Sequence, residues 1–135
     1  MAGYSATPLW KKLGYKPGLS VWIEHAPTGY RQLLELPADL EIVWEPRCRA
    51  GQPFAHVFVD QAATLKSRLK SLRSALAADG VLWISWPKKS SGVATDITED
   101  TIRSLALPLG FVDVKVCAVD TTWSGLKLMI RKSER

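Results

Sequence analysis

Short runs of strand-forming residues alternate along this chain with segments of helical periodicity, and this alternation limits the possible folds more than any other feature. Proline and glycine separate the segments. The six strand-like runs are 19–23, 40–44, 54–59, 81–86, 112–119 and 126–132. Strands that alternate with helices favour a parallel sheet with right-handed crossovers. We therefore predict a three-layer α/β domain that occupies residues 1–135 and contains a mostly parallel sheet of about six strands.

The longest helical pattern lies between the third and fourth strand-like runs. Four leucines recur there at intervals of four, three and four residues and form one apolar stripe: Leu65, Leu69, Leu72 and Leu76. The Asp-Gly pair at residues 79–80 is expected to end this helix. Further along, Asp96 with Glu99 forms a capping-box pattern, which predicts a helix that extends to Leu109.

The two ends of the chain carry signals of their own. Leu9 and Leu13 have helical spacing, so residues 1–18 are expected to form a helical segment that packs on the sheet. A further short helix is predicted for residues 28–36. The last two strand-like runs are joined by residues 121–125. A connection this short permits an antiparallel hairpin but not a parallel crossover.

Charge and cysteine content exclude several classes of protein. The chain carries 18 basic and 13 acidic residues, a net charge of +5, which permits an anionic partner. Residues 61–94 are basic but residues 21–60 are net acidic, and no nucleic-acid-binding motif occurs, so nucleic acid is not the expected partner. Cys48 and Cys117 form no metal-ligand pattern, so we expect neither a metal site nor a disulfide framework. With no membrane-spanning run and no export signal, we expect a cytoplasmic protein whose oligomeric state the sequence leaves open.

The order of the predicted elements resembles the Rossmann-like methyltransferase fold. A helix leads into residues 80–84 (GVLWI), and residues 109–111 (LGF) lead into the final hairpin, which are common phrases of that fold. In that fold the last strand runs antiparallel to the others. The resemblance covers residues 18–131, although one strand-helix unit of the fold is missing after Trp44.

Three longer phrases are similar to an uncharacterised bacterial family, the domain of unknown function 3052. They are YSATPL with KKLGYKPG within residues 4–18, WPKKSSGVATD at residues 86–96, and KVCAVD with WSGL within residues 115–126. This resemblance spans the chain, but it implies no activity.

Methyltransferases of this fold bind S-adenosylmethionine at a glycine-rich turn after the first strand, where the backbone must approach the cofactor closely. Compared with that pattern, residues 21–29 keep only Thr28-Gly29, and His25 and Pro27 replace glycines. The dinucleotide pattern GxGxxG is also absent. Glu45 ends the second strand, where the fold places the carboxylate that holds a ribose. We therefore expect a degenerate S-adenosylmethionine site and no bound cofactor.

The loop after the fourth predicted strand is the most distinctive candidate site. In an open parallel sheet, ligands bind beyond the carboxyl ends of the strands, where this loop lies. It offers two ammonium groups, two hydroxyl groups and a flexible glycine, which together can hold a phosphate or a carboxylate. The predicted ligand-binding residues are Trp86, Lys88, Lys89, Ser90, Ser91 and Gly92, with Glu45 and Trp123 at the same edge.

The sequence favours a non-catalytic binding or regulatory module for an anionic small molecule. His25 with Glu24 is the candidate catalytic pair, because a histidine can act as a general base. No paired nucleophile, metal-ligand set or GxSxG elbow accompanies this pair, so the sequence does not favour an enzyme. Two alternatives remain open: a divergent S-adenosylmethionine-dependent methyltransferase and a protein-interaction subunit.

Overall fold

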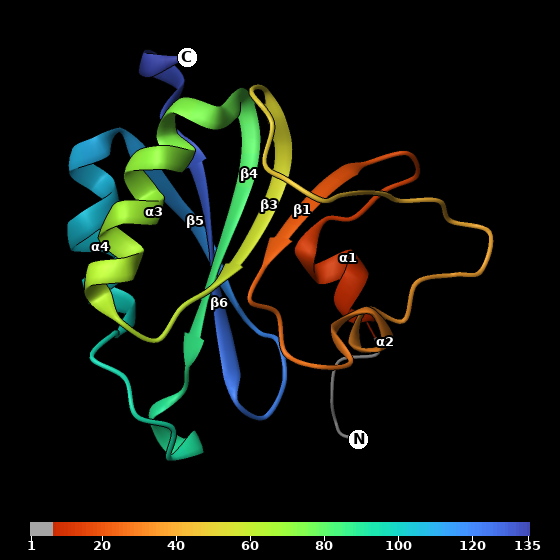
Figure 1. Ribbon diagram of the computed structural model, residues 1–135, viewed down its shortest axis with the longest axis horizontal. Helices are drawn as coiled ribbons and strands as arrows, with labels where there is room; N and C mark the ends of the chain where they lie inside the picture. Colours follow the sequence, from red (N-terminus) through yellow and green to blue (C-terminus); the bar gives the residue numbers. More distant parts are fainter. Residues whose placement is uncertain (1–6) are drawn as a thin grey trace.

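The computed structural model describes residues 7–135, and in this part of the chain six strands form one sheet in the order β2-β1-β3-β4-β6-β5 (Figure 1). The strands are β1 (Ser20–Glu24), β2 (Val43–Glu45), β3 (Gln52–Phe58), β4 (Leu76–Pro87), β5 (Phe111–Ala118) and β6 (Trp123–Ile130). β1 pairs in parallel with β2 and β3, and β3 pairs in parallel with β4. β6 runs antiparallel to both of its neighbours, β4 and β5. The predicted α/β sheet, mostly parallel with a final antiparallel hairpin, is confirmed.

Helices cover the sheet unevenly. They are α1 (Leu9–Leu13), α2 (Tyr30–Leu34), α3 (Ala62–Ala75) and α4 (Glu99–Ala106), with 3₁₀ turns η1 (Lys89–Ser91), η2 (Leu107–Leu109) and η3 (Lys132–Glu134). The longer helices α3 and α4 lie side by side against the sheet, and the short helices α1 and α2 lie on its other side (Figure 1). The connection between β2 and β3, residues 46–51, contains no helix, in agreement with the unit that the sequence lacks. No helix within residues 7–135 is long and apolar enough to cross a membrane.

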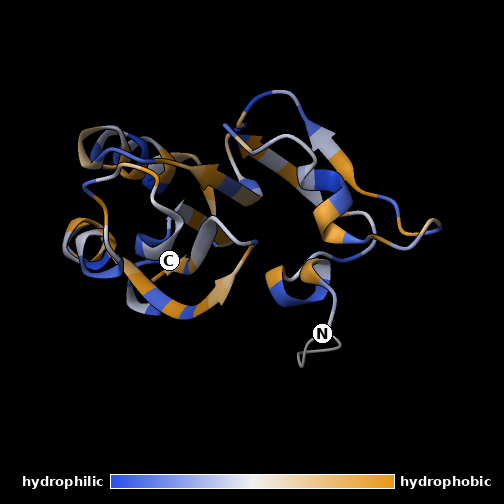
Figure 2. Cartoon of the chain, turned by 90° about the horizontal axis from the view of Figure 1, so that it is seen from below, coloured by the Kyte–Doolittle hydropathy of each residue, from blue (hydrophilic) through white to orange (hydrophobic). Residues whose placement is uncertain are grey.

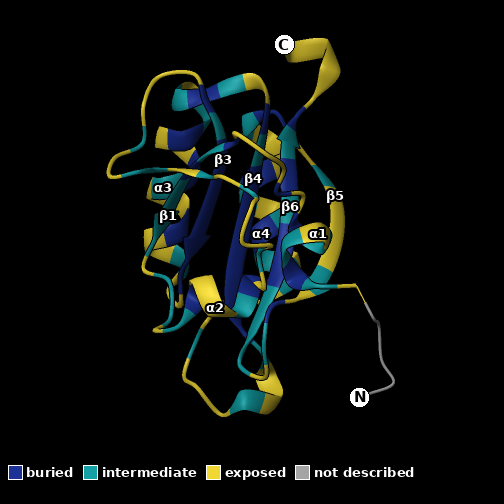
Figure 3. Cartoon of the chain, turned by 90° about the vertical axis from the view of Figure 1, so that its right-hand side faces the viewer, coloured by how far each residue is buried: buried dark blue, intermediate teal, exposed yellow. Residues whose placement is uncertain are grey.

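Two apolar clusters pack against the sheet. The cluster beneath α3 and α4 includes Leu65, Leu69, Leu72, Ile102, Ala106, Leu82 and Ile84. The cluster beneath α1 and α2 includes Leu9, Leu13, Tyr30, Leu34, Val21, Phe54, Phe58 and Trp83. β4 contributes to both clusters, because successive side chains of a strand point to opposite faces of the sheet. The central parts of β3 and β4 are accordingly buried (Figure 3), whereas the helices carry both hydrophilic and hydrophobic residues (Figure 2).

The N-terminal segment contains the short helix α1. Leu9 and Leu13 of this helix are buried, and the Trp83 indole Nε1–H donates a hydrogen bond to the Leu13 carbonyl oxygen at 2.8 Å. Gly14 ends the helix with φ +92°, a left-handed conformation that glycine adopts without strain. Residues 1–6, which carry the start of the first family-like phrase, lie outside the described residues.

The end of α3 differs from the sequence-based prediction. The helix stops at Ala75 rather than at residues 79–80, and β4 already begins at Leu76, which pairs with Gln52. The glycine of the Asp-Gly pair has a different role. A Cβ at Gly80 would lie 3.0 Å from the backbone oxygens of both Ala77 and Gln52, so only glycine fits where these segments meet.

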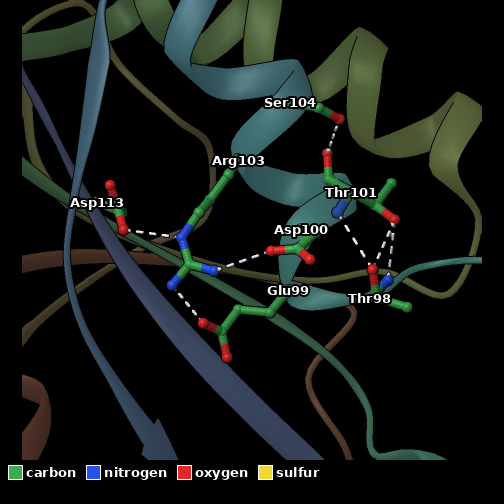
Figure 4. Close-up of polar contacts among 7 residues, drawn as sticks. All are labelled: Thr98, Glu99, Asp100, Thr101, Arg103, Ser104 and Asp113. Carbon is green, nitrogen blue, oxygen red and sulfur yellow. Dashed lines mark hydrogen bonds and ion pairs between the residues drawn. The ribbon is translucent and has the colours of Figure 1, made fainter.

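Asp96 does not cap α4, contrary to the prediction. Thr98 is the N-cap, and its side chain forms a capping box with Thr101 (Figure 4). The Asp96 Oδ1 instead accepts a hydrogen bond of 2.7 Å from the backbone N–H of Ala62, in the first turn of α3. A carboxylate is favoured at the positive end of that helix dipole. Asp96 thus fixes the segment before α4 to the start of α3.

Candidate functional site

A pocket lies at the point where the order of the parallel strands reverses. The chain passes from β1 to β2 on one side and later to β3 on the other, so this switch point lies between β1 and β3. Ligands of open α/β sheets bind beyond the carboxyl ends of the strands at such a point. The pocket has a volume of about 380 Å³, and we call it the switch-point pocket. Its lining residues are His25, Phe58, Val59, Asp60, Gln61, Thr64 and Trp123.

The turn between β1 and α2 forms one side of the switch-point pocket. His25 has φ +58° and Gly29 has φ +84°, so both adopt the left-handed conformation. A residue with a Cβ adopts this conformation at a cost of about 1–2 kcal/mol. The backbone at His25 thus has a conformation that glycine favours, yet the residue carries an exposed side chain that lines the pocket.

Two aromatic rings and a carboxylate form other parts of the wall. Phe58 stacks on His56 with ring centroids 4.3 Å apart, and Trp123 packs edge-on against Phe58 at 5.1 Å. Asp60 is exposed, and its carboxylate forms no hydrogen bond or ion pair with another residue of the 7–135 segment. Aromatic faces and carboxylates both attract organic cations. The pocket is therefore suited to an aromatic or cationic small molecule.

Glu24 does not join His25, so the structure does not assemble the candidate catalytic pair. The Glu24 carboxylate forms an ion pair with Arg68 of α3, with 2.5 Å between Oε1 and Nε. Glu24 is the last residue of β1, and the backbone turns to a positive φ at His25. Glu24 therefore holds α3 against the sheet, while the His25 imidazole lines the pocket.

Glu45 also lies outside the switch-point pocket. Its carboxylate accepts a hydrogen bond of 2.7 Å from the Ser20 hydroxyl, at the start of β1, and forms an ion pair with Arg49 at 3.3 Å. The amide of Gln52 donates to the same Ser20 hydroxyl. The side chain of Glu45 is only 10% exposed. This carboxylate therefore has two partners within the protein, and a ligand-binding role for Glu45 stays a prediction.

The loop after β4 forms a second pocket, of about 430 Å³, which we call the loop pocket. Three of the predicted ligand-binding residues, Trp86, Lys89 and Gly92, line it. Lys88, Ser90 and Ser91 do not belong to its lining. The Ser91 hydroxyl is used within the turn, because it donates to the Lys88 carbonyl oxygen at 2.6 Å and accepts from the Val93 backbone N–H at 3.2 Å. A ligand-binding role for these residues stays a prediction.

A buried polar network links the elements beneath the switch-point pocket. Tyr15 and Tyr30 share a hydrogen bond of 2.8 Å between their hydroxyls, and the Tyr30 hydroxyl bonds the His56 Nδ1 at 2.7 Å. The His56 Nε2 bonds the Ser85 hydroxyl at 2.7 Å. Burial lowers the pKa of His56 to about 3 and raises the pKa of both tyrosines, so every member is neutral at neutral pH.

Sequence reasoning found this site only in part. It placed His25, Asp60 and Trp123 at the carboxyl edge of the sheet, where this pocket lies, but it did not choose Phe58 or Asp60 as ligand-binding residues. The one signal for the buried network was a histidine inside that run, since a buried polar group needs partners. Within residues 7–135, no group of three or more potential metal ligands occurs.

Comparisons with solved structures identify the architecture. An S-adenosylmethionine-dependent methyltransferase from Aquifex aeolicus matches with a TM-score of 0.65 and 14% identity, over 89% of this chain and 86% of that chain. A Sulfolobus solfataricus protein proposed to be a type 11 methyltransferase matches with a TM-score of 0.63 and 16% identity, over 94% and 92%. The chain has a Rossmann-like methyltransferase fold. A TehB-like S-adenosylmethionine-dependent methyltransferase from Corynebacterium glutamicum matches with a TM-score of 0.56 and 10% identity, over 96% and 90%.

These matches concern the methyltransferase fold alone, because fold does not imply function at such low identity. No family model matches the chain, so the resemblance to the domain of unknown function 3052 is not confirmed. No curated protein sequence matches it either.

Two of the matching proteins are S-adenosylmethionine-dependent methyltransferases, and their cofactor carries an aromatic base, a sulfonium cation and an ammonium group. The Glu45 carboxylate lies outside the switch-point pocket and is bonded to Ser20 and Arg49. The switch-point pocket supplies groups that fit this cofactor. Asp60 offers a carboxylate to a cation, and Phe58 and Trp123 offer aromatic surfaces to a base or a sulfonium.

Proposed function

We propose that this chain is a divergent S-adenosylmethionine-dependent methyltransferase whose cofactor site is the switch-point pocket. One observation carries the proposal: in a methyltransferase-like fold, the pocket at the switch point is lined by a free carboxylate and two aromatic rings. The non-catalytic module that the sequence favoured has weaker support, since matching structures of this fold include S-adenosylmethionine-dependent methyltransferases.

Each lining residue has a distinct role in this proposal. Asp60 binds the cationic end of the cofactor, and Trp123 with Phe58 packs against its aromatic or sulfonium part. When bound, the cofactor supplies an electrophilic methyl group. His25 lines the same pocket, and in this proposal its imidazole accepts a proton from a hydroxyl or amine of the methyl acceptor.

Calorimetric titration with S-adenosylmethionine and S-adenosylhomocysteine tests the proposal. We expect wild-type protein to bind both with dissociation constants in the micromolar range. Asp60→Asn removes one charge from the pocket while keeping the size of the side chain, and it should weaken binding by about 10-fold, equivalent to about 1.4 kcal/mol. Asp79→Asn, at an exposed aspartate of β4, is the matched control and should bind like the wild type.

The proposal is wrong if wild-type protein shows no binding at millimolar cofactor. It is also wrong about the site if Asp60→Asn and Asp79→Asn bind equally well. Circular dichroism of each variant establishes that the fold is intact, which is expected because both side chains are exposed.

A further inference from the structure

The loop pocket and the switch-point pocket are neighbours at the carboxyl edge of the sheet. Thr95 lines the loop pocket, and its hydroxyl donates a hydrogen bond of 2.7 Å to the carbonyl oxygen of Asp60. Asp60 lines the switch-point pocket. A second bond, from the Ala62 N–H to Asp96, fixes the same segment to the start of α3. Two hydrogen bonds therefore connect the segment that lines the loop pocket to the segment that lines the switch-point pocket.

The floor of the loop pocket is apolar. Trp86 is 7% exposed and Ile97 is 3% exposed, and both belong to the cluster beneath α3 and α4. Pro87, Val93 and Ala94 complete the apolar part of the lining. Apolar walls with a few polar groups are typical of pockets that bind small molecules, whose volumes are about 300–1,000 Å³. The volume of about 430 Å³ falls in this range.

One basic and one acidic side chain line the loop pocket. Lys89 lines it and forms no ion pair with a carboxylate anywhere in residues 7–135, and the same holds for Lys88 beside it. Glu99 is the one acidic residue of the lining, and its carboxylate pairs with Arg103, which also pairs with Asp100 and Asp113 (Figure 4). Lys89 is therefore the group of the lining to which an anion can bind.

We propose that the loop pocket binds the methyl acceptor, and that this acceptor is a small apolar molecule that carries a carboxylate or phosphate group. The apolar body lies on Trp86 and Ile97, and the anionic group binds Lys89. The role as acceptor rests on the proposed function of the switch-point pocket. The anionic ligand that the sequence predicted is, in this account, the substrate rather than a regulator.

Matched probe pairs test the proposal by ¹H–¹⁵N chemical-shift titration. Indole-3-acetate and phenyl phosphate are the anionic probes, and indole-3-acetamide and phenol are their neutral counterparts. We expect saturable shifts of residues 86–99 with at least one anionic probe, and about 10-fold weaker binding of its neutral counterpart. Lys89→Ala should weaken the binding of the anionic probe by about 10-fold as well. Lys70→Ala, which removes an exposed lysine of α3, should leave it unchanged.

Three results would overturn the assignment. The first is that neither anionic probe binds at a concentration of about 10 mM. The second is equal binding of the charged and neutral probes, and the third is a set of chemical-shift changes centred on α3. Co-titration with S-adenosylhomocysteine separates this proposal from the proposed function. If both ligands bind together, the acceptor role is supported, and mutual displacement contradicts it. If S-adenosylhomocysteine does not bind, the proposed function is wrong, and the acceptor role, which rests on it, is wrong as well. If S-adenosylhomocysteine binds but the anionic probes do not, only the acceptor assignment is wrong.

Discussion

His56 lies inside the apolar strand β3 without solvent contact, and its two ring nitrogens have different partners. Its Nδ1 bonds the Tyr30 hydroxyl and its Nε2 bonds the Ser85 hydroxyl. A neutral imidazole carries one donor and one acceptor, so it satisfies both hydroxyls, whereas an imidazolium would be a buried charge without a carboxylate beside it. His56 therefore connects α2, β3 and β4, and its burial favours the neutral form.

The stability of the protein should fall in mild acid because of His56. Its pKa is lowered from 6.5 to about 3 by burial, so below pH 6.5 the unfolded chain binds a proton that the folded chain does not. The free energy of unfolding should then decrease as the pH falls from 6.5 towards 3, by about 1.4 kcal/mol per pH unit from this residue. Above pH 6.5 the residue contributes no pH dependence.

Urea unfolding over this pH range measures the effect of His56. His56→Gln should show a flatter dependence than the wild type, and His25→Gln, at an exposed histidine, should keep the wild-type dependence. Equal slopes for His56→Gln and the wild type would contradict the assignment. If His56→Gln does not fold, NMR titration of the His56 ring in wild-type protein gives the answer, since an ordinary pKa there would also contradict it.

Arg103 connects α4 to the edge strand β5 through several carboxylates. Its Nε bonds Asp113 at 2.8 Å, and its other guanidinium nitrogens pair with Glu99 and Asp100 (Figure 4). The hydrogen bond from Arg103 lowers the pKa of Asp113. Arg103→Ala should return the pKa of Asp113 to its ordinary range.

The titration of the Asp113 carboxyl carbon in the two proteins measures this change directly. Stability gained from this pair is present above the ordinary pKa of aspartate and is lost as the pH falls through the lowered value. Lys132→Ala, at an exposed lysine of η3, is the control and should leave the Asp113 titration unchanged. An Asp113 pKa that is equal in wild type and Arg103→Ala would contradict the interaction.

At the scale of elements, sequence patterns predicted those helices and turns whose structure depends on residues close together in the sequence. The leucine stripe of α3 and the short connection of the β5–β6 hairpin each leave one structural solution, and both were predicted. The end of α3 and the cap of α4 were not, because contacts distant in sequence decide them. Gly51 and Gln52 meet the chain just after Ala75, and the N–H of Ala62 attracts Asp96.

The candidate site follows the same division. The expectation that polar groups gather at the carboxyl edge came from strand order, and His25 and Trp123 do line a pocket at that edge, although the sequence did not group them together. The direction of a side chain at a strand end depends on the residue with which it interacts. Glu24 forms an ion pair with Arg68, and Glu45 accepts a hydrogen bond from Ser20. Neither partner can be predicted from sequence spacing.

Helix α1 should stabilise the fold although it is only five residues long. Leu13 is fully buried beneath it, so Leu13→Ala should lower the free energy of unfolding by about 2–5 kcal/mol. Lys11→Ala, on the exposed side of the same helix, should change it by less than about 0.5 kcal/mol. Chemical denaturation measures both values. A Leu13→Ala variant as stable as Lys11→Ala would mean that α1 is not part of the core in solution.

At the scale of the whole molecule, the strand order determines where function is expected. β1 and β3 are adjacent but their neighbouring connections leave in opposite directions, which opens the edge where the switch-point pocket lies. Within this architecture His25 and Pro27 belong to the first turn, and the Glu45 carboxylate of β2 is bonded to Ser20 and Arg49. In our account, the cofactor binds at Asp60, Phe58 and Trp123.

The most direct test of this account is a ¹H–¹⁵N chemical-shift map of S-adenosylhomocysteine binding to uniformly labelled wild-type protein. The account predicts saturable shifts of the backbone signals of residues 24–29 and 58–64, together with the indole N–H of Trp123, which line or flank one pocket. The backbone signal of Glu45 should move less than these. No saturable shifts, or shifts centred on Glu45 and the start of β1, would contradict the claim that the switch-point pocket holds the cofactor.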